Sequence, residues 1–322
     1  MEFWRSRSLW ITLIVLMGVG LWPVATGSAT LREDLFLIFM LIVLASSLNI
    51  LLGYTGYVNF GHIVFFGLGG YIGFYLMHRH GWGLWPAMAA AGVATAAMAL
   101  GLGAIILRLR GAYFALATIG INEAVRAFVT NFEPFGGPTG MSLNFAVYNA
   151  YGGPARALWL SYGTLLALAL LTVGVSFAVK SSKFGLGLMA IREDEDAALV
   201  LGVRAPRWKT LAYALSALFP GMVGVLFFFK NGNIEPGDAF RLHLSIETIV
   251  MVMLGGQGTV WGPILGAALY ERLRGYLLTS PLFKNLHLAL AGAFLLLIIL
   301  FIPAGLIGWL RARFPALRRM LA

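Results

Sequence analysis

Four acidic residues in a row mark the part of the sequence with the clearest chemical pattern. Acidic side chains favour the first turn of a helix, where the backbone dipole is positive, and a following glycine suits the left-handed residue that ends a helix. A helix this short needs a partner surface to be stable. We therefore predict a short helix that binds the membrane interface or another protein, the alternative being a solvated loop with a run of charges. The segment comprises Glu193, Asp194, Glu195, Asp196, Ala197, Ala198, Val200, Leu201 and Gly202.

Polar residues and glycines within long apolar segments form a second set of candidates. Ionisable groups are costly at membrane depth and often have a function there. Glu123 and Arg126 stand three residues apart on one predicted helix and can pair on its face. The alternative role is structural, with an ion pair near the outer interface and glycines that allow close packing. The residues that we predict to line a solute pathway are Asn49, Gly53, Gly56, Asn59, Asn122, Glu123, Glu247, Gly255 and Gly258.

Several kinds of catalytic site are absent from the sequence. It has no phosphate-binding loop of the form Gly-x-x-x-x-Gly-Lys-Ser/Thr, no Gly-x-Ser-x-Gly elbow and no His-Glu-x-x-His pair. It also has no cysteine, which excludes disulfides and thiolate metal sites. We therefore expect neither enzyme activity nor a metal or cofactor bound by this chain. The net charge of +10 is explained by basic cytoplasmic loops, so nucleic acid is not an expected partner.

The composition indicates that lipid surrounds most of the chain. Of its 322 residues, 60% are hydrophobic and 11% charged, with a mean hydropathy of +0.85, whereas soluble domains are about 45–50% apolar and about 25% charged. A spanning helix needs about 20 mostly apolar residues. We predict an all-α integral membrane protein that forms a single bundle of about 8–10 transmembrane helices over residues 1–322. The first apolar segment resembles a signal peptide, and we interpret it as a retained first helix. The firm spans are 9–27, 35–52, 62–77, 84–107, 112–130, 158–179, 210–229 and 286–310.

A further apolar region, 244–270, is interrupted by Gly255, Gly256 and Gly258. Its two segments, 244–254 and 260–270, are each short for a crossing, so we predict either two short helices or a re-entrant pair. Part of the region repeats an earlier motif: Leu52-Gly-x-x-Gly-x-Val58 matches Leu254-Gly-x-x-Gly-x-Val260. Internal repeats of this kind occur in many transporters, although so short a motif in a glycine-rich chain leaves common descent of the two halves open.

Lysine and arginine residues set the predicted orientation, because the cytoplasmic loops of membrane proteins are rich in them. Clusters of these residues lie at the N-terminus, after the fourth span, within 180–208 and at the C-terminus. Alternating spans place all four clusters on the same side. We therefore predict cytoplasmic N and C termini, a cytoplasmic loop at 180–208 and an external loop at 131–157.

Four stretches together resemble the permeases of the branched-chain amino acid uptake family of ABC importers. They are residues 49–62, 108–123, 187–224 and 254–266, and the likeness extends over roughly residues 35–310. Within the third stretch, Asp196-Ala-Ala-x-x-x-Gly202 resembles the "Glu-Ala-Ala, three residues, Gly" loop of ABC importer permeases, with Asp in place of Glu. In that family this loop forms a coupling helix that docks in a groove of a separate ATPase.

The resemblance implies a multi-pass permease of the bacterial inner membrane that moves branched-chain amino acids or a related small polar solute by alternating access. It implies two ATPase subunits that bind ATP and Mg²⁺, a second and homologous permease subunit, and a periplasmic solute-binding protein near the 131–157 loop. Relatives within the family import urea, amides or other amino acids, and these substrates stay open. An autonomous secondary transporter or channel is the alternative from a different class, and it predicts transport without ATP or partners.

Overall fold

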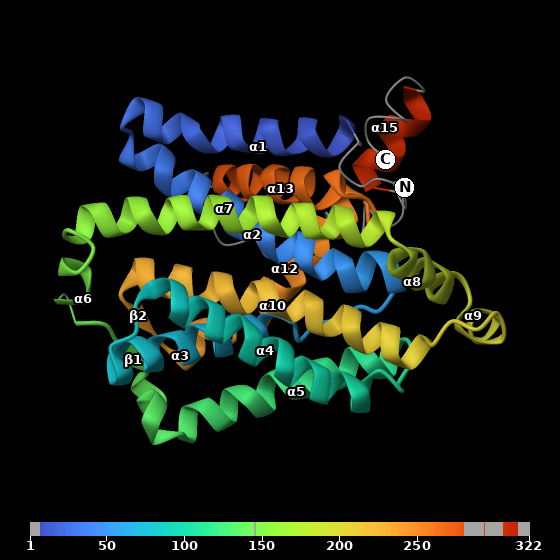
Figure 1. Cartoon of the computed structure of the whole chain (residues 1–322), viewed down its shortest axis with the longest axis horizontal. Coiled ribbons are helices and arrows are strands. Elements are labelled where there is room, and N and C mark those ends of the chain that lie inside the picture. Colours follow the sequence, from blue (N-terminus) through green and yellow to red (C-terminus); the bar gives the residue numbers. More distant parts are fainter. Residues whose placement is uncertain (1–6, 145, 280–292, 294–304, 315–322) are drawn as a thin grey trace.

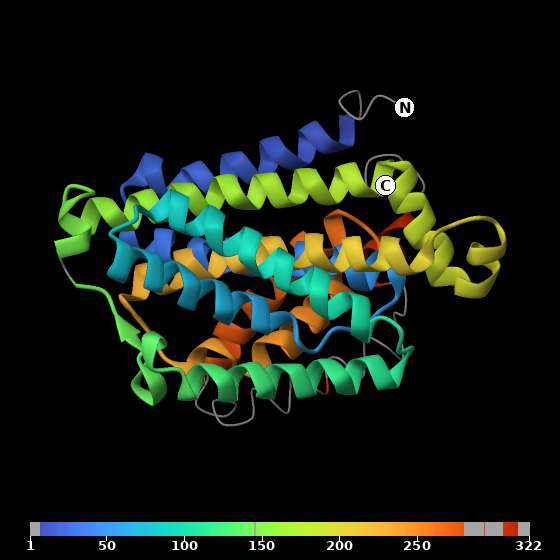
Figure 2. The same cartoon turned by 60° about the horizontal axis from the view of Figure 1, so that its bottom comes forward.

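Long apolar helices run side by side through most of the computed structural model, which describes residues 7–144, 146–279, 293 and 305–314. Figures 1 and 2 show them lying roughly along the longest axis of the molecule. Because lipid cannot bond to exposed backbone groups, a helix that satisfies its own groups is the expected spanning element. The long elements are α1 (Arg7–Thr26), α2 (Ala29–Thr55), α3 (His62–His80), α4 (Leu84–Ile106), α5 (Ala112–Asn131), α7 (Pro154–Ser181), α10 (Ala205–Asn231), α12 (Leu242–Gly255) and α13 (Trp261–Thr279).

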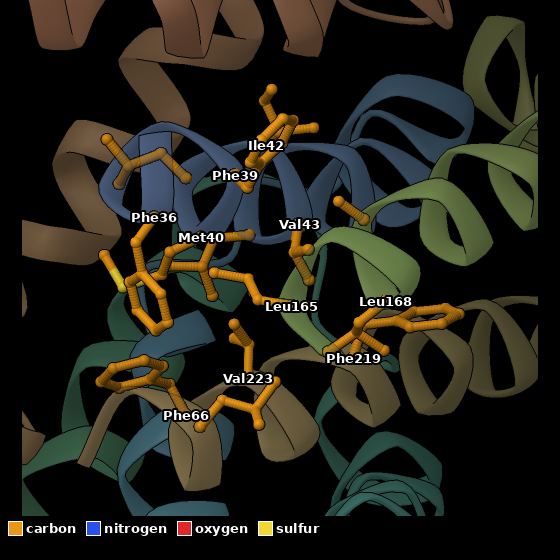
Figure 3. Packing of buried hydrophobic residues seen from close by; sticks show 14 of the residues in the cluster. Phe36, Phe39, Met40, Ile42, Val43, Phe66, Leu165, Leu168, Phe219 and Val223 are labelled. Carbon is orange, nitrogen blue, oxygen red and sulfur yellow. The ribbon is translucent and has the colours of Figure 1, made fainter. Parts of the chain in front are cut away.

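Helix α2 forms the centre of the bundle and is buried along almost its whole length. Helix α10 is the second central element and packs against α4, α3 and α2. Figure 3 shows how Val43 of α2 lies toward Leu165 of α7 and Val223 of α10 within the main hydrophobic cluster. By contrast, α1 and α5 expose most of their surface, as expected of helices that face lipid or another subunit.

Shorter elements gather at the two ends of the bundle. One end holds η2 (Glu133–Phe135), η3 (Gly137–Thr139), α6 (Ala146–Asn149), α11 (Pro236–Ala239) and a two-stranded antiparallel sheet of β1 (Met141–Ser142) and β2 (Asn233–Ile234). Met141 pairs with Ile234 and Ser142 with Asn233. The opposite end carries α8 (Lys183–Glu193) and α9 (Glu195–Val200), and Figure 1 places the start of α1 and α15 (Gly305–Arg313) at this same end. The described ends of the chain therefore lie on one side, as predicted.

The predicted spans agree with the helices wherever the structure describes them. Six helices in the described part of the chain are long and apolar enough to cross a membrane: α1, α2, α4, α5, α7 and α10. Helix α3 matches the predicted span 62–77, and most of the predicted span 286–310 lies outside the described residues.

The region 244–270 forms two helices, α12 and α13, that pack against each other. Helix α12 has 14 residues, which corresponds to about 21 Å, whereas the hydrocarbon core is about 30 Å thick. The bend after it, which begins at the buried Gly256, packs against Gly53 near the end of α2. Irregular backbone is tolerated in a membrane protein where protein rather than lipid surrounds it, and the burial of Gly256 shows that protein surrounds this bend.

Candidate functional site

The acidic segment of the cytoplasmic loop is divided between two helices rather than placed in one first turn. Glu193 ends α8, Asp194 is the N-cap of α9, and only Glu195 and Asp196 lie in the first turn of α9. The reason for this correction is local. Oδ1 of Asp194 accepts hydrogen bonds from the backbone nitrogens of Asp196 and Ala197, both at 2.9 Å. A capping aspartate has extended backbone geometry, which interrupts the preceding helix at that residue.

Helix α9 exposes an apolar tip and buries one alanine. Val200 is 88% exposed and Leu201 82% exposed, whereas Ala198 is only 2% exposed. The sequence predicts a helix that binds a partner surface, and Ala197 and Ala198 are its two adjacent small residues. The structure keeps Ala197 on the surface but packs Ala198 into the cluster formed with α4, α8 and α10. Figures 1 and 2 show α9 projecting beyond the ends of the long helices, so its tip is accessible to a partner.

Glycine 202 ends the α9 segment, as the sequence predicted. Its φ of +89° lies in the left-handed region, where residues with a side chain are disfavoured. This turn allows the nitrogen of Val203 to donate a hydrogen bond back to the carbonyl of Ala198 at 3.0 Å. The chain then enters α10 only three residues after Gly202. Helix α9 is therefore joined to α10 by a short, defined connection.

A buried ion pair anchors α9 to the membrane bundle. Nζ of Lys209, on the first turns of α10, lies 2.6 Å from Oε1 of Glu195, and the two side chains are 3% and 14% exposed. Lys209 also donates to the hydroxyl of Tyr57 at 2.8 Å and to the carbonyl of Leu107 at 2.9 Å. The Tyr57 hydroxyl in turn donates to Oε2 of Glu195 at 2.9 Å. The Glu195 carboxylate thus connects α9 to α10 and to the turn after α2. Lys209 also connects this group to the end of α4 through the Leu107 carbonyl.

A second, exposed ion pair lies beside the buried one. Arg110 donates to both carboxylate oxygens of Asp196, at 3.0 and 2.8 Å. This hydrogen bonding holds the pKa of Asp196 below its usual range and raises that of Arg110. Burial, together with the acceptor Glu195, raises the pKa of Tyr57, so this phenol stays protonated as a hydrogen-bond donor.

Asn49 joins the end of α2 to the bend between α12 and α13. Its Nδ2 donates to the carbonyl of Thr259 and its Oδ1 accepts from the nitrogen of Gly258, both at 2.9 Å. The side chain is completely buried. A Cβ atom on Gly53 would lie 2.6 Å from the nitrogen of Gly258. Close approach of the two backbones therefore requires glycine at position 53.

The two glycine motifs that repeat one another in the sequence meet at this junction. Nη1 of Arg192, in the last turn of α8, donates to the carbonyl of Gly53 at 2.8 Å. A Cβ on Gly258 would lie 3.1 Å from the same nitrogen, and one on Gly56 would lie 3.3 Å from Cγ of Arg192. The loop that carries α9 thus contacts both motifs directly. We refer to Asn49, Gly53, Gly56, Arg192 and Gly258 as the glycine junction.

The remaining pathway candidates lie on α5, in the turn after α2 and on α12. Asn122 is buried on α5 and donates to the carbonyl of Phe240 at 3.2 Å, while the side chain of Asn59 accepts from the nitrogen of Gly61 at 2.9 Å. Glu123 pairs with Arg126 at 3.4 Å, and both are about half exposed, which confirms the predicted pairing on one helix face. Gly255 ends α12 and packs against Gly262, next to the junction. Glu247 lies apart from all of these, on α12.

Two cavities open at the cytoplasmic end, next to the anchored helix. One of about 670 Å³ lies between α4 and α10, and one of about 480 Å³ lies between the turn after α2, the start of α5 and the end of α8. Arg110 and Glu195 line both of them. In the described part of the chain no group of three or more His, Asp or Glu residues could hold a metal ion.

The sequence did not identify Tyr57, Arg110, Arg192 or Lys209 as members of this site. In the sequence the three basic residues stand out only as charges that set orientation. A signal for Lys209 is present, because it stands one turn inside a helix whose neighbours Ala205, Ala212 and Tyr213 are apolar. A lysine there is buried at a cost unless it is paired.

Comparison with known proteins supports the likeness noted from the motifs. A family model described as branched-chain amino acid transport system / permease component matches residues 30–302. The high-affinity branched-chain amino acid transport system permease protein LivM of Escherichia coli K12 is 30% identical over 95% of this chain and 76% of its own length. LivM of Salmonella typhimurium LT2 is 29% identical over the same shares, and the permease protein LivH of that organism is 28% identical over 45% of each chain. No solved structure matches this chain.

The family match extends over most of the chain, and the spanning helices lie within or beside it. The chain therefore belongs to the family of branched-chain amino acid transport permeases, as a multi-pass permease subunit of an ABC importer in the bacterial inner membrane.

Proposed function

We propose that this chain moves branched-chain amino acids, or closely related small polar solutes, into the cytoplasm by alternating access driven by separate ATPase subunits. The observation that carries the proposal is the exposed apolar tip of α9, formed by Val200 and Leu201, on a helix anchored to the bundle by the buried pair Glu195–Lys209. A short helix that buries one side and offers the other is suited to transmit force from a docked partner. The relatives at 29% and 30% identity are named as amino acid permeases.

The mechanism uses two connections from α9 and α8 into the bundle. When the ATPase subunits close around ATP, α9 moves with them and Glu195 carries that motion to α10 through Lys209. Arg192 carries it to Gly53 and the glycine junction. ATP drives the change because the closed ATPase pair favours one of two bundle arrangements over the other. This chain supplies positioning and the solute path, and its partners supply hydrolysis.

The proposed partners are assigned to exposed surfaces at the two ends of the bundle. Two ATPase subunits would receive α9 and the equivalent helix of a second permease subunit, and the similarity to LivH supports a homologous second subunit. A solute-binding protein would dock at the end that holds the 131–157 loop, where β1 pairs with β2. Reconstitution of the chain with these partners tests the proposal. ATP-dependent leucine uptake supports it, and uptake by the chain alone without ATP would favour an autonomous transporter instead.

Placing aspartate at both Val200 and Leu201 should separate the permease from its ATPase. Both side chains are more than 80% exposed, so the variant should fold normally, but a charged tip cannot be buried against a partner without a large desolvation cost. We expect ATP-driven uptake to fall at least tenfold and the ATPase to be lost when the tagged permease is purified.

The matched control for that variant is Leu186→Asp, because Leu186 is an exposed apolar residue on neighbouring α8 with 62% exposure. It should retain the ATPase. Normal uptake and normal co-purification in the Val200→Asp/Leu201→Asp chain would show that α9 is not the docking helix.

A further inference from the structure

A cavity of about 260 Å³ lies between α2, α12 and α13, away from the cytoplasmic site. One part of its wall is apolar, including Leu41, Phe66 and Phe227. The other part is strongly polar. It consists of Asp238, Arg241, His243, Glu247, Glu271 and Arg274. Cavities that hold drug-sized ligands start at about 300 Å³, so this one suits a smaller molecule with both charged and apolar parts.

The two least exposed carboxylates of the cavity, Glu247 and Glu271, lie on α12 and α13, several residues from the bend that joins these helices. Glu247 precedes the end of α12 by eight residues and Glu271 follows the start of α13 by ten. At about 1.5 Å per residue, both lie about 12–15 Å along their helices from the bend that joins α12 and α13. Ionisable groups within a bundle of membrane helices are costly and are expected where a solute must be bound or moved.

The charges in the cavity are only partly satisfied by one another. Nη1 of Arg274 lies 3.3 Å from Glu271, but its Nε lies 3.9 Å from Glu247, which is too long for a hydrogen bond. This Nε is buried and has no hydrogen-bond acceptor among the described residues. Two carboxylates therefore share one guanidinium, with exposures of only 15% for Glu247 and 16% for Glu271. The centre of the cavity has one negative charge in excess and one unused donor.

The mouth of the cavity carries a looser pair. Arg241 and Asp238 lie 3.7 Å apart and are about 60% exposed, so water screens them strongly. His243 is also exposed. The entrance of the cavity therefore carries one exposed positive and one exposed negative charge. Its interior is less exposed to solvent and has two carboxylates for one guanidinium.

We propose that this cavity is a solute-binding site within the membrane that takes an α-amino acid with an apolar side chain. The proposal rests on the proposed function as an importer. The carboxylates of Glu247 and Glu271 accept the ammonium group, the free donors of Arg274 bind the carboxylate, and the apolar wall at Leu41, Phe66 and Phe227 receives the side chain. An uncharged solute such as urea would leave the buried charges unpaired, which is costly.

The first test measures binding of radiolabelled leucine to the purified full-length chain in nanodiscs. Unlabelled leucine should compete, whereas N-acetyl-leucine, which lacks the ammonium, and leucinamide, which lacks the carboxylate, should compete at least tenfold more weakly. Equal competition by N-acetyl-leucine, or no leucine binding at all, overturns the proposal. This test needs no variant, so it holds even if a substitution prevents folding.

The second test uses Glu247→Gln and Glu271→Gln, which keep the side-chain shape and remove one charge each. Both should lower leucine affinity at least tenfold while ATPase stimulation by the binding protein in the full importer is retained. The control is Glu33→Gln, because Glu33 pairs with Lys230 at 2.6 Å outside the cavity. The leucine affinity of this variant chain should not change. Unchanged affinity in both cavity variants, or a loss of thermal stability alone, means that the cluster only holds α12 against α13.

The two tests also separate this proposal from the proposed function. If the reconstituted importer takes up no leucine with ATP, the proposed function fails, while binding to the isolated chain still reports on the cavity. If uptake is normal and insensitive to both substitutions, the importer assignment stands and the binding site lies elsewhere.

Discussion

Replacing Lys209 with methionine is expected to destabilise the folded chain by about 3 kcal/mol, because removing one partner of a buried ion pair costs about 3–5 kcal/mol. The value falls at the lower end because Glu195 keeps the hydrogen bond from the Tyr57 hydroxyl and its longer ion pair with Arg110 at 3.7 Å. The variant should also lose most ATP-driven uptake, since α9 is no longer tied to α10 or, through Lys209, to the carbonyl of Leu107. Thermal unfolding in detergent measures the first effect, and transport in proteoliposomes the second.

A double variant distinguishes stability from coupling. Adding Glu195→Gln to Lys209→Met removes both charges, so much of the lost stability should return, but uptake should stay low because the ionic tether is still absent. Arg110→Gln is the contrasting control. Arg110 bonds closely to the exposed Asp196 and lies farther from Glu195, at 3.7 Å, and exposed pairs add little to stability in water. A Lys209→Met chain with unchanged unfolding temperature and normal uptake would refute the anchoring role.

Gly53→Ala is expected to have the second largest effect, on the glycine junction. The added methyl group would lie 2.6 Å from the backbone nitrogen of Gly258 and would collide with the side chain of Asn49. Overpacking of this kind costs about 1–3 kcal/mol, and the upper end applies because backbone cannot move aside as a flexible side chain would. We expect a lower unfolding temperature and loss of uptake, as α2 and the α12–α13 bend are forced apart.

Gly174→Ala is the matched control for this substitution. Gly174 lies inside α7, and a methyl group added there would meet no neighbouring group within 4 Å. Alanine is favoured over glycine inside helices by up to about 1 kcal/mol, so this variant should be at least as stable as the unmodified chain and should transport normally. If Gly53→Ala behaved in the same way, close approach at the junction would not matter for function.

The sequence predicted the helices well because hydropathy and length are local properties. Every predicted span within the described residues coincides with a helix, and the interruption at Gly255–Gly258 separates α12 from α13. The end of α9 at Gly202 was equally readable, because the left-handed conformation favours glycine. The start of α9 was predicted too early, since an acidic run does not reveal which of its members acts as the cap.

The candidate site could be predicted only in part, because its contacts join residues far apart in the chain. Asn49 bonds to Gly258 across 209 positions, and Lys209 bonds to Tyr57 across 152. Hydrophobic periodicity along the sequence does not predict contacts between residues so far apart. The inward position of Ala198 and the meeting of the two repeated motifs likewise depend on how α2, α8 and α12 pack, and this was decided by the fold as a whole.

Helix α10 connects the two ends of the molecule as one continuous element. It holds Lys209 in its early turns, and it ends at Asn231, so that only the C-cap Gly232 separates it from β2, which pairs with β1. Its 27 residues make a helix about 40 Å long, so one element spans the distance between the cytoplasmic site and the external end. Pro220 lies inside this helix and, because it lacks a backbone N–H, removes one of the helix hydrogen bonds. In the proposed mechanism, a displacement of α10 at its cytoplasmic end would therefore also move the pair β1–β2 at the opposite end of the bundle.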